Sequence, residues 1–586
     1  MMRYPGGCLV HDYDWHNAVG PIDQRPNYSF GVDEFLAYCQ AVGAEPLITV
    51  SDYTGTSQDA ADLVEYLNAP ADTRHPWALK RAQWGHPKPY GVRYFELGNE
   101  SDHGNHNTIP HKKFSDEAYA QWVNTSAGLM RKVDPTIQIG AVVSGGQVTD
   151  PWNSTVLTKT KGVVNFIIIH TYPVGYHVGA MTDDLMQGCM ATVDQTVTAL
   201  MKYQNMIKKY SGKNLPLAIT EYNASFVQEK PIPYRFSYGA ALFCADYIRV
   251  LLQPKMNVLM ANYWHFSNGY WGMIRGDGPN YKKLPAYYLY RLWAQHFGQR
   301  LVTTEVTSPR ITFNGICGVA PCNGNKYQSG KPFTENLLNP QQIKTSSGPG
   351  YSIELRSDGI LVAKLKNLDS QQYPAIAVIH APKTGIGYTL SFEARTTNPE
   401  LTNLTTGLGL ALNDLRGWEA TSSAIKLEGI DGSTEWKKFY GIFNTLPDCP
   451  GTVVLWRLCG TKASPATGTL EVRNIKVTAY QQQRFPAYNV ITSSASLSAD
   501  RKTLYLIIFN KHMTDNIPVT VRLKGVPHIS SVQRWMVTGP SLASTNLDRD
   551  EVREVESAVT MPLPANGTIT YDAPARSMTA IEVHIR

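Results

Sequence analysis

Two segments of the chain place a glutamate at the end of an apolar run. FELGNESDHG (95–104) carries Asn99 and Glu100, and LAITEYNAS (217–225) carries Glu221. A buried parallel strand that ends in a carboxylate sets that group at the rim of a sheet or barrel. Hydrolysis of a glycosidic bond needs two such carboxyl groups, one to protonate the leaving oxygen and one to act as nucleophile or base. The sequence therefore predicts Glu100 and Glu221 as a catalytic pair, with the Asn99 amide placed to bind the sugar 2-hydroxyl.

The elements that must position these residues are short apolar strands alternating with amphipathic helices. Strand candidates up to residue 300 are PLITVS (46–51), GVRYFELGNE (91–100), IQIGAVVS (137–144), VNFIIIHTYP (164–173), LPLAITEYNA (215–224) and NVLMANYWHFS (257–267). Helical periodicity begins at Val32 and at Val193, and further helices are expected over 115–132, 239–252 and 285–297. This alternation predicts β–α–β units, in either a doubly wound sheet or a (β/α)8 barrel.

We favour the barrel for residues 1–299. No G-x-G-x-x-G or P-loop follows any strand, and the residues with chemical potential stand at the ends of several different strands. With RYPGG (3–7) counted as the end of a strand, seven strands are found. The first barrel strand, which should precede Arg3, is then absent from the chain.

Beyond residue 300 the pattern becomes short alternating strands without a long helix. Eight period-2 runs in 316–480 predict a jelly-roll β-sandwich resembling a carbohydrate-binding module. Its candidate sugar-stacking residues are Trp418, Trp436 and Tyr440, although core packing explains each of them as well. Residues 481–586, joined by 300–315, predict a second sandwich that the jelly roll interrupts.

Composition excludes several classes of protein. The chain has 586 residues with 43% hydrophobic and 17% charged, and no apolar run is long enough to span a bilayer. The 54 Lys and Arg against 48 Asp and Glu give a net charge of +6 without a basic block. We therefore expect no membrane partner and no nucleic-acid partner.

The cysteines and glycosylation motifs favour an extracellular glycoprotein. Cys317/Cys322 and Cys449/Cys459 have the spacing of local disulfides, whereas the other four cysteines are expected as buried thiols. N-x-S/T motifs stand at Asn27, Asn99, Asn124, Asn153, Asn223, Asn403 and Asn566. The His and Asp residues of HDYDWH (11–16) lack further ligands for a metal. We expect neither a metal nor a cofactor.

Several motifs in order resemble glycoside hydrolase family 51, most of whose characterised members are α-L-arabinofuranosidases. They are RYPGG (3–7), Trp15 with GPIDQR (20–25), GVDEFLAYCQAVGAEPLITV (31–50), AADLVEYLN (60–68), PYGVRYFELGNE (89–100), HTYP (170–173), LWAQHFGQRLV (292–302) and DAPARSMTAIEVHI (572–585). The resemblance covers the barrel and the terminal sandwich but not 316–480. It implies a clan A barrel with its acid/base after strand four and its nucleophile after strand seven.

Carried over to this chain, the resemblance makes Glu100 the acid/base and Glu221 the nucleophile of a retaining double displacement. The same resemblance predicts five substrate-binding residues: Arg3, Trp15, Asn99, His170 and Tyr172. Trp264, at the end of the last strand, is a sixth candidate, although core packing explains it as well. Arg3 would anchor the nucleophile or a hydroxyl, Tyr172 would donate to Glu221, and Trp15 would form an apolar wall. One departure is Ser51-Asp52-Tyr53, where the family has an Asn-rich turn.

The leading hypothesis is an exo-acting, retaining α-L-arabinofuranosidase that acts on arabinose-containing plant polysaccharide or oligosaccharide. An endo-β-1,4-glucanase or xylanase, or another furanosidase, could use the same machinery. A non-catalytic glycan-binding protein on a decayed barrel is the alternative from another class.

Overall fold

Seven parallel strands form the central sheet of the N-terminal half, in the order β1-β2-β3-β4-β5-β6-β7. Their bounds are β1 Met2–Tyr4, β2 Pro46–Val50, β3 Tyr94–Leu97, β4 Gln138–Val142, β5 Phe166–Thr171, β6 Leu217–Tyr222 and β7 Val258–Tyr263. A doubly wound sheet would reverse its strand order at a switch point, whereas this order is strictly sequential. The predicted barrel architecture is confirmed, with β1 and β7 as the outer strands of the described sheet. Across that opening the Asn262 side-chain amide donates to the Met1 carbonyl at 3.3 Å.

The computed structural model describes most of the chain. The described residues are 1–26, 29–105, 112–145, 148–173, 183–224, 233–267, 271–276, 281–312, 314–315, 336–380, 387–396, 409–415, 422–426, 435–444, 451–462, 465–479, 483–484, 487–526, 528–554, 559–562 and 567–586. Cys317, Cys322, Cys449 and Trp418 lie outside them. Cys39, Cys189 and Cys244 are buried thiols as expected, and Cys8 is half-buried.

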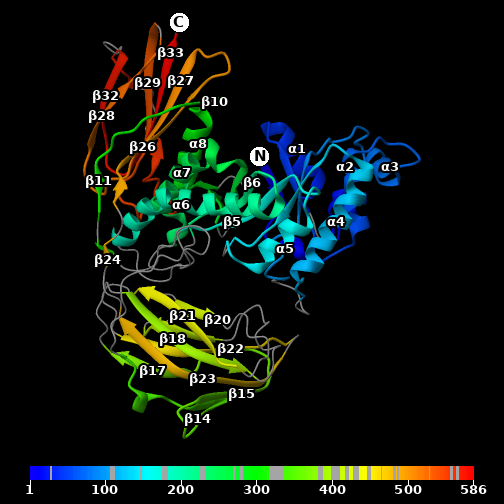
Figure 1. Ribbon diagram of the computed structural model, residues 1–586, viewed down its shortest axis with the longest axis vertical. Coiled ribbons are helices and arrows are strands. Elements are labelled where there is room, and N and C mark those ends of the chain that lie inside the picture. The colour runs from blue at the N-terminus through cyan, green and yellow to red at the C-terminus, as the bar shows by residue number, and fades with distance from the viewer. Residues whose placement is uncertain are drawn as a thin grey trace.

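Helices pack around the sheet (Figure 1). They are α1 Val32–Val42, α2 Ser57–Asn68, α3 Pro76–Gln83, α4 Asp116–Val133, α5 Pro151–Lys159, α6 Asp183–Ser211, α7 Tyr238–Leu251 and α8 Pro285–Gln295. Local sequence sets their ends: Ser115 and Ser237 accept hydrogen bonds at the starts of α4 and α7, and Gly43 ends α1 at a φ of 67°. The helices cover strands that are apolar on both faces, so β5 and β6 are buried along their whole length.

The C-terminal sandwich lies above the barrel helices in Figure 1. Its larger sheet runs β10-β26-β27-β33-β29-β30, with β31 beside β29, and its smaller sheet is β28-β32. These strands are β10 Arg300–Val302, β26 Ile491–Leu497, β27 Thr503–Asn510, β28 Ile517–Arg522, β29 Ile529–Thr538, β30 Arg553–Glu554, β31 Val559–Thr560, β32 Thr568–Ala573 and β33 Ser577–Ile585. β10 pairs with β26, although the strands β11 to β25 lie between them in the chain.

Those intervening strands form a second sandwich at the bottom of Figure 1. One sheet runs β13-β14-β15-β23-β18-β21, and the other runs β16-β22-β19-β20 with β17 also on β22. Their bounds are β13 Ser346–Gly348, β14 Tyr351–Leu355, β15 Leu361–Leu368, β16 Gln371–Gln372, β17 Ala375–His380, β18 Gly387–Thr396, β19 Gly409–Asp414, β20 Ser422–Lys426, β21 Lys437–Asn444, β22 Gly451–Cys459 and β23 Ala466–Ala479. Short two-stranded ribbons pair β8 Ile274–Arg275 with β9 Lys282–Lys283, β11 Arg310–Ile311 with β25 Tyr488–Asn489, and β12 Asn314–Gly315 with β24 Gln483–Arg484. All eight predicted strands are found.

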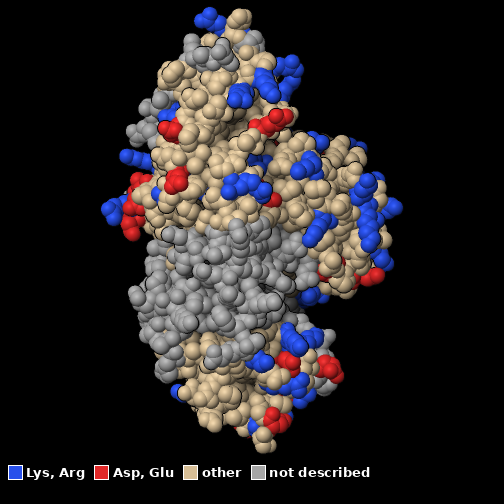
Figure 2. Space-filling view, turned by 60° about the vertical axis from the view of Figure 1, so that its left-hand side comes forward, with Lys and Arg blue, Asp and Glu red and all other residues tan. Residues whose placement is uncertain are grey.

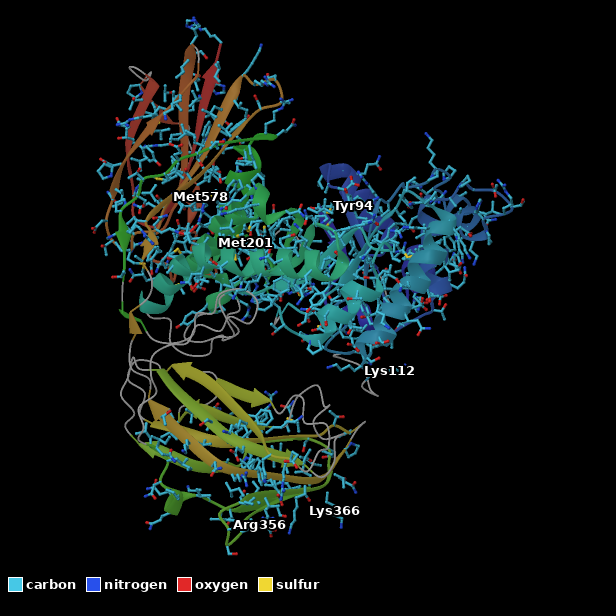
Figure 3. The ribbon with its side chains drawn as sticks, in the orientation of Figure 1. Tyr94, Lys112, Met201, Arg356, Lys366 and Met578 are labelled. Atoms are coloured by element: carbon cyan, nitrogen blue, oxygen red, sulfur yellow. The ribbon has the colours of Figure 1, made fainter. Side chains whose placement is uncertain are left out.

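Three buried clusters make up the core. The jelly roll and the C-terminal sandwich each have an apolar interior of their own. The largest cluster, by contrast, combines barrel residues with Phe509, Leu542 and Met578 of the C-terminal sandwich. Met578 lies where the sandwich meets the barrel helices (Figure 3). Barrel and C-terminal sandwich therefore share a hydrophobic core, and no described residue of the jelly roll belongs to it.

Buried charges reinforce the junction of barrel and sandwich. Lys511 Nζ lies 3.2 Å from Asp246 Oδ2 on α7, and both side chains are fully buried. Arg249 donates to Asp246 at 2.6 Å, and Thr492 of β26 donates to it at 3.0 Å. Burial alone would raise the pKa of Asp246, but Arg249 and Lys511 outweigh it and lower that pKa to about 2.

We expect Lys511→Met to lower the free energy of unfolding by about 3 kcal/mol, because it removes one partner of a buried ion pair. Chemical denaturation at pH 7 measures the change, and Lys502→Met, at an exposed lysine, is the control. A Lys511→Met protein as stable as the control would show that this cluster does not hold the two domains together.

Candidate active site

The carboxyl ends of β3, β5 and β6 bring Glu100, His170 and Glu221 together. His170 Nδ1 lies 2.9 Å from Glu100 Oε1 and 3.4 Å from Glu221 Oε2. One ligand-type atom from each of the three residues lies within 4.8 Å of the other two. The carboxyl groups of Glu100 and Glu221 thus face each other closely, at a separation typical of retaining glycosidases and below the ~6.5–9.5 Å of inverting ones.

Arg3, at the centre of β1, holds Glu221 from the opposite side. Its Nη1 donates to Glu221 Oε1 at 2.7 Å, while its Nε and Nη2 donate to the two oxygens of Glu96 at 2.6 and 2.9 Å. The Tyr172 hydroxyl donates to the other oxygen of Glu221 at 2.7 Å. Both oxygens of Glu221 therefore accept strong hydrogen bonds, which orient the carboxylate and stabilise its charge.

A chain of donors fixes the tautomer of His170. Glu96 accepts from Arg3, from Thr49 at 3.2 Å and from the Thr220 hydroxyl at 2.9 Å. Since the Thr220 proton points at Glu96, its oxygen accepts from His170 Nε2, which lies 3.1 Å away. The other ring nitrogen, Nδ1, is left to share a proton with Glu100.

The turn that carries Glu100 has an unusual backbone. Glu100 adopts a φ of 46°, and Gly98 a φ of 88°. A non-glycine residue in the left-handed region costs about 1 to 2 kcal/mol, so the surrounding contacts must hold it there. Between them, Asn99 accepts from Arg3 Nη2 at 2.7 Å through its side-chain oxygen, and its buried Nδ2 has no hydrogen-bond partner among the described residues. That free donor belongs to the residue predicted to bind the sugar.

Burial and neighbouring charges shift the pKa values of all three central groups. Burial raises the pKa of Glu100, but hydrogen bonds from His103 and His170 outweigh it and hold that pKa well below its usual value. Burial raises the pKa of Glu221, against the opposing charges of His170 and Arg3. Burial lowers the pKa of His170, but Glu221 and Glu100 raise it further than burial lowers it. These two shifts favour an ionised Glu100 beside a protonated His170.

Glu100, His170 and Glu221 also lie close enough together to hold a metal ion, and they are the group of described residues that does. Arg3 and Tyr172 already supply donors to both oxygens of Glu221. A cation there would have to displace them, so the donor set fits a proton-transfer site better than a metal site.

The two predicted tryptophans lie in different surroundings. Half-buried Trp264, which follows β7, packs its ring so close to Gly7 that a Cβ there would clash with it. Its carbonyl accepts from the Asn223 amide. Trp15 packs against His16 and Trp77, donates to the Asp59 carbonyl, and lines a cavity of about 150 Å³. Glu100, His170 and Glu221 do not line that cavity, although Thr49, which donates to Glu96, does.

Sequence reasoning missed Glu96, Thr220 and His103. Glu96 has a usable signal, because a charged residue in the middle of a four-residue strand buried on both faces needs a partner. Thr220 has none, since a threonine is ordinary in a strand. His103, whose Nδ1 lies 3.6 Å from Glu100 Oε2, became visible only through the fold of the turn.

Comparison with protein families identifies the chain. The α-L-arabinofuranosidase 1 domain matches residues 1–175, and the α-L-arabinofuranosidase C-terminal domain matches residues 220–577, more than half of the chain. The chain belongs to glycoside hydrolase family 51, the α-L-arabinofuranosidase family. The family 39 glycosyl hydrolases also match this family 51 chain, over residues 89–272.

Individual relatives agree with this assignment. The intracellular exo-α-(1→5)-L-arabinofuranosidase of Streptomyces lividans is 35% identical over 29% of this chain and 27% of its own length. The enzyme of that name from Halalkalibacterium halodurans is 30% identical over 39% and 47%. These alignments thus span half or less of the relatives. The α-L-arabinofuranosidase structure of Thermotoga maritima shares the fold, with a TM-score of 0.60 and 19% identity over 100% of this chain and 87% of that one.

The prediction of an extracellular protein is wrong, because the similar proteins from S. lividans and H. halodurans are named intracellular. The glycosylation motifs misled because a three-residue pattern recurs by chance. Asn99, Asn153 and Asn223 are in fact fully buried, out of reach of a modifying enzyme. Among the described residues, no helix is long and apolar enough to cross a bilayer.

Asp52 lies beneath the turn that carries Glu100. Burial raises the pKa of this carboxyl to about 6 from 3.8, against the lowering effect of His11 and of the Ser101 hydroxyl. A carboxyl whose pKa is raised in the folded state stabilises the fold below the unfolded pKa and loses that contribution as pH rises through the folded pKa. The native protein should therefore lose stability between about pH 4 and pH 6.

The side chain of Asp52→Asn does not titrate, so this variant does not lose the contribution that wild type loses. Between pH 4 and pH 7 we expect its free energy of unfolding to rise relative to that of wild type by on the order of 3 kcal/mol. Urea unfolding at both pH values measures the difference, and Asp23→Asn, at an exposed position, corrects for the general effect of pH. If the gap between the two proteins does not change with pH, the raised pKa of Asp52 is wrong.

Proposed function

We propose that this protein is a retaining, exo-acting α-L-arabinofuranosidase. The observation that carries the proposal is the close approach of Glu100 and Glu221, whose oxygens lie within 4.8 Å of each other. A double displacement needs its two carboxyl groups about 5 Å apart, because both must reach the same anomeric carbon and its leaving oxygen.

Glu221 is the proposed nucleophile. Its side chain is 6% exposed and receives hydrogen bonds from Arg3 and Tyr172, so its oxygen lies in a fixed position for attack.

Glu100 is the proposed acid/base. Its side chain is 24% exposed, which leaves it accessible to the leaving group and then to water. In the free site its pKa is low and the proton lies on His170, whose Nδ1 is 2.9 Å away. We infer that a bound sugar, by excluding water from the ionised pair, drives that proton from His170 to Glu100 before the first step.

The proposed reaction has two chemical steps. Glu221 bonds to the anomeric carbon while the glycosidic bond breaks and Glu100 gives its proton to the departing oxygen. Glu100, now ionised, takes a proton from water, and the hydroxide bonds to the anomeric carbon as the ester to Glu221 breaks. The unpartnered Nδ2 of Asn99 is the proposed donor to a sugar hydroxyl, and the Trp264 ring a proposed wall of the sugar site.

The proposed substrates are arabinose-containing plant polysaccharides or oligosaccharides. The names of the two relatives described above support an arabinose-containing substrate, since both are exo-α-(1→5)-L-arabinofuranosidases. Trp15 is proposed to contact the substrate beyond the first sugar, through the cavity that it lines.

We propose that the chain divides into three domains: the barrel, 1–299; the C-terminal sandwich, 300–315 with 481–586; and the jelly roll, 316–480. We further propose that 316–480 binds glycan. Trp436 is a poor platform, because Arg395 and Arg473 lie over its ring at 4.6 and 4.1 Å from the centroid. Trp418 and Tyr440 are therefore the preferred sugar-stacking candidates, and the test below uses Trp418.

Glu221→Ala should lower the turnover of 4-nitrophenyl α-L-arabinofuranoside by more than about 10³-fold, because the covalent step is lost. Glu100→Ala should retain part of the activity on this substrate and regain turnover with azide, which needs no base. β-Xyloside and β-glucoside substrates run alongside. If wild type hydrolyses either of these faster than the arabinofuranoside, the proposed sugar specificity is wrong. If it hydrolyses no small substrate, an endo-acting enzyme or a glycan-binding protein is favoured.

Binding by the jelly roll is tested in the full-length Glu221→Ala protein, which does not consume its ligand. In affinity electrophoresis through arabinoxylan, we expect Trp418→Ala to abolish the mobility shift and Trp436→Ala to preserve it. Equal shifts for all three proteins would show that neither tryptophan takes part in glycan binding.

A further inference from the structure

A buried group of polar side chains contacts the Gly98–Asn99–Glu100 turn. Asp52 Oδ2 accepts from the Ser101 hydroxyl at 2.5 Å and from the Asn99 amide nitrogen at 3.4 Å. His11 Nε2 donates to the Asn99 carbonyl at 2.7 Å. These four residues, which we call the turn anchor (His11, Asp52, Asn99 and Ser101), are fully or almost fully buried.

Each contact of the anchor falls on the backbone or the flank of the residue before Glu100. Asp52 accepts a hydrogen bond from the backbone N–H of Asn99, and His11 donates one to the backbone C=O of Asn99. The same contacts require glycine at position 98, because a Cβ there would clash with Ser101 Oγ and with Asp52. The anchor therefore fixes the rotation of the turn from which the Glu100 side chain projects.

The anchor is itself held by neighbouring loops. Thr54 donates to the His11 carbonyl at 2.7 Å, and Tyr53 donates to the Ser101 carbonyl at 3.0 Å. The Tyr53 ring also meets the His11 ring edge to face, with 5.3 Å between centroids. Side chains from the loops after β1, β2 and β3 thus close around one turn.

A buried carboxylate at position 52 is costly unless its hydrogen bonds do something that an apolar residue cannot. Asp52 Oδ1 has no hydrogen-bond partner among the described residues and lies 3.9 Å from His11 Nε2. Stability alone does not account for this arrangement. The strained φ of 46° at Glu100 does, since such a conformation persists only where the surroundings enforce it.

We propose that Asp52, acting with Ser101 and His11, is a positioning residue that holds the Glu100 turn in its strained conformation and so aims the acid/base at the leaving group. The inference rests on the proposed function of Glu100. Asp52 acts through the backbone of Asn99 and does not touch the substrate.

Leaving groups of different acidity separate positioning from general damage. Departure of 4-nitrophenolate needs little protonation, whereas departure of a sugar alkoxide from α-(1→5)-L-arabinobiose depends on the acid. Asp52→Asn should therefore lower kcat/KM for arabinobiose by about tenfold or more, and for 4-nitrophenyl α-L-arabinofuranoside by less than about threefold. On the aryl substrate kcat and KM should fall together, and azide should raise kcat, because the second step still needs Glu100 as base.

The matched control is Asp246→Asn. Asp246 is another fully buried carboxylate that accepts from a hydroxyl, that of Thr492 at 3.0 Å, but it belongs to the junction of barrel and sandwich. It should lower stability and affect both substrates equally. Ser101→Ala should reproduce the pattern of Asp52→Asn, and the double variant should lose no more than the larger single loss.

Hydrogen exchange provides a readout that needs no substrate. Amides of residues 98–103 should exchange about tenfold faster in Asp52→Asn and remain protected in Asp246→Asn. Faster exchange with the leaving-group difference supports the inference. Unchanged exchange, or equal loss on both substrates, overturns it. Failure of the proposed function looks different: wild type and Glu100→Ala would then hydrolyse neither arabinoside, whatever the exchange at the turn.

Discussion

The site depends on one buried guanidinium. Arg3 contacts Glu96 with two nitrogens and Glu221 with a third, and a fourth contact reaches Asn99. Glu96 is fully buried and Glu221 nearly so, and an uncompensated charge at either position would cost several kcal/mol. Only a planar group with donors along several edges can serve all three at once, so lysine would not replace it.

From this contact the remaining geometry follows. Glu96, satisfied by Arg3 and two threonines, orients the Thr220 hydroxyl so that its oxygen accepts from His170 Nε2, while Nδ1 faces Glu100. A buried salt bridge that by itself is weak evidence for stability acts here to specify orientation.

The three domains contribute unequally to this arrangement. The barrel supplies every described residue of the cluster, and the C-terminal sandwich is bound to it through a shared core and the buried Lys511–Asp246 pair. The jelly roll has a separate core and an outer face of paired charges, including Arg356 with Glu471 at 2.8 Å (Figure 3). Over the face shown in Figure 2, Lys and Arg are interspersed with Asp and Glu, in keeping with the absence of a basic block in the sequence.

The sequence by itself determined the strand and helix pattern, the barrel with its interrupted sandwich, and the position of two glutamates at the ends of strands. Buried strands must be apolar, so an acidic residue where each strand ends is conspicuous in one dimension. It could not determine that Glu96 shares Arg3, that His11 and Asp52 meet beneath Asn99, or that Trp15 lines another cavity. Those contacts join residues far apart in the chain, and their types are ordinary at each position alone. Only the closing of the sheet, which gathers the loops after β1, β2 and β3 at one rim, decided them.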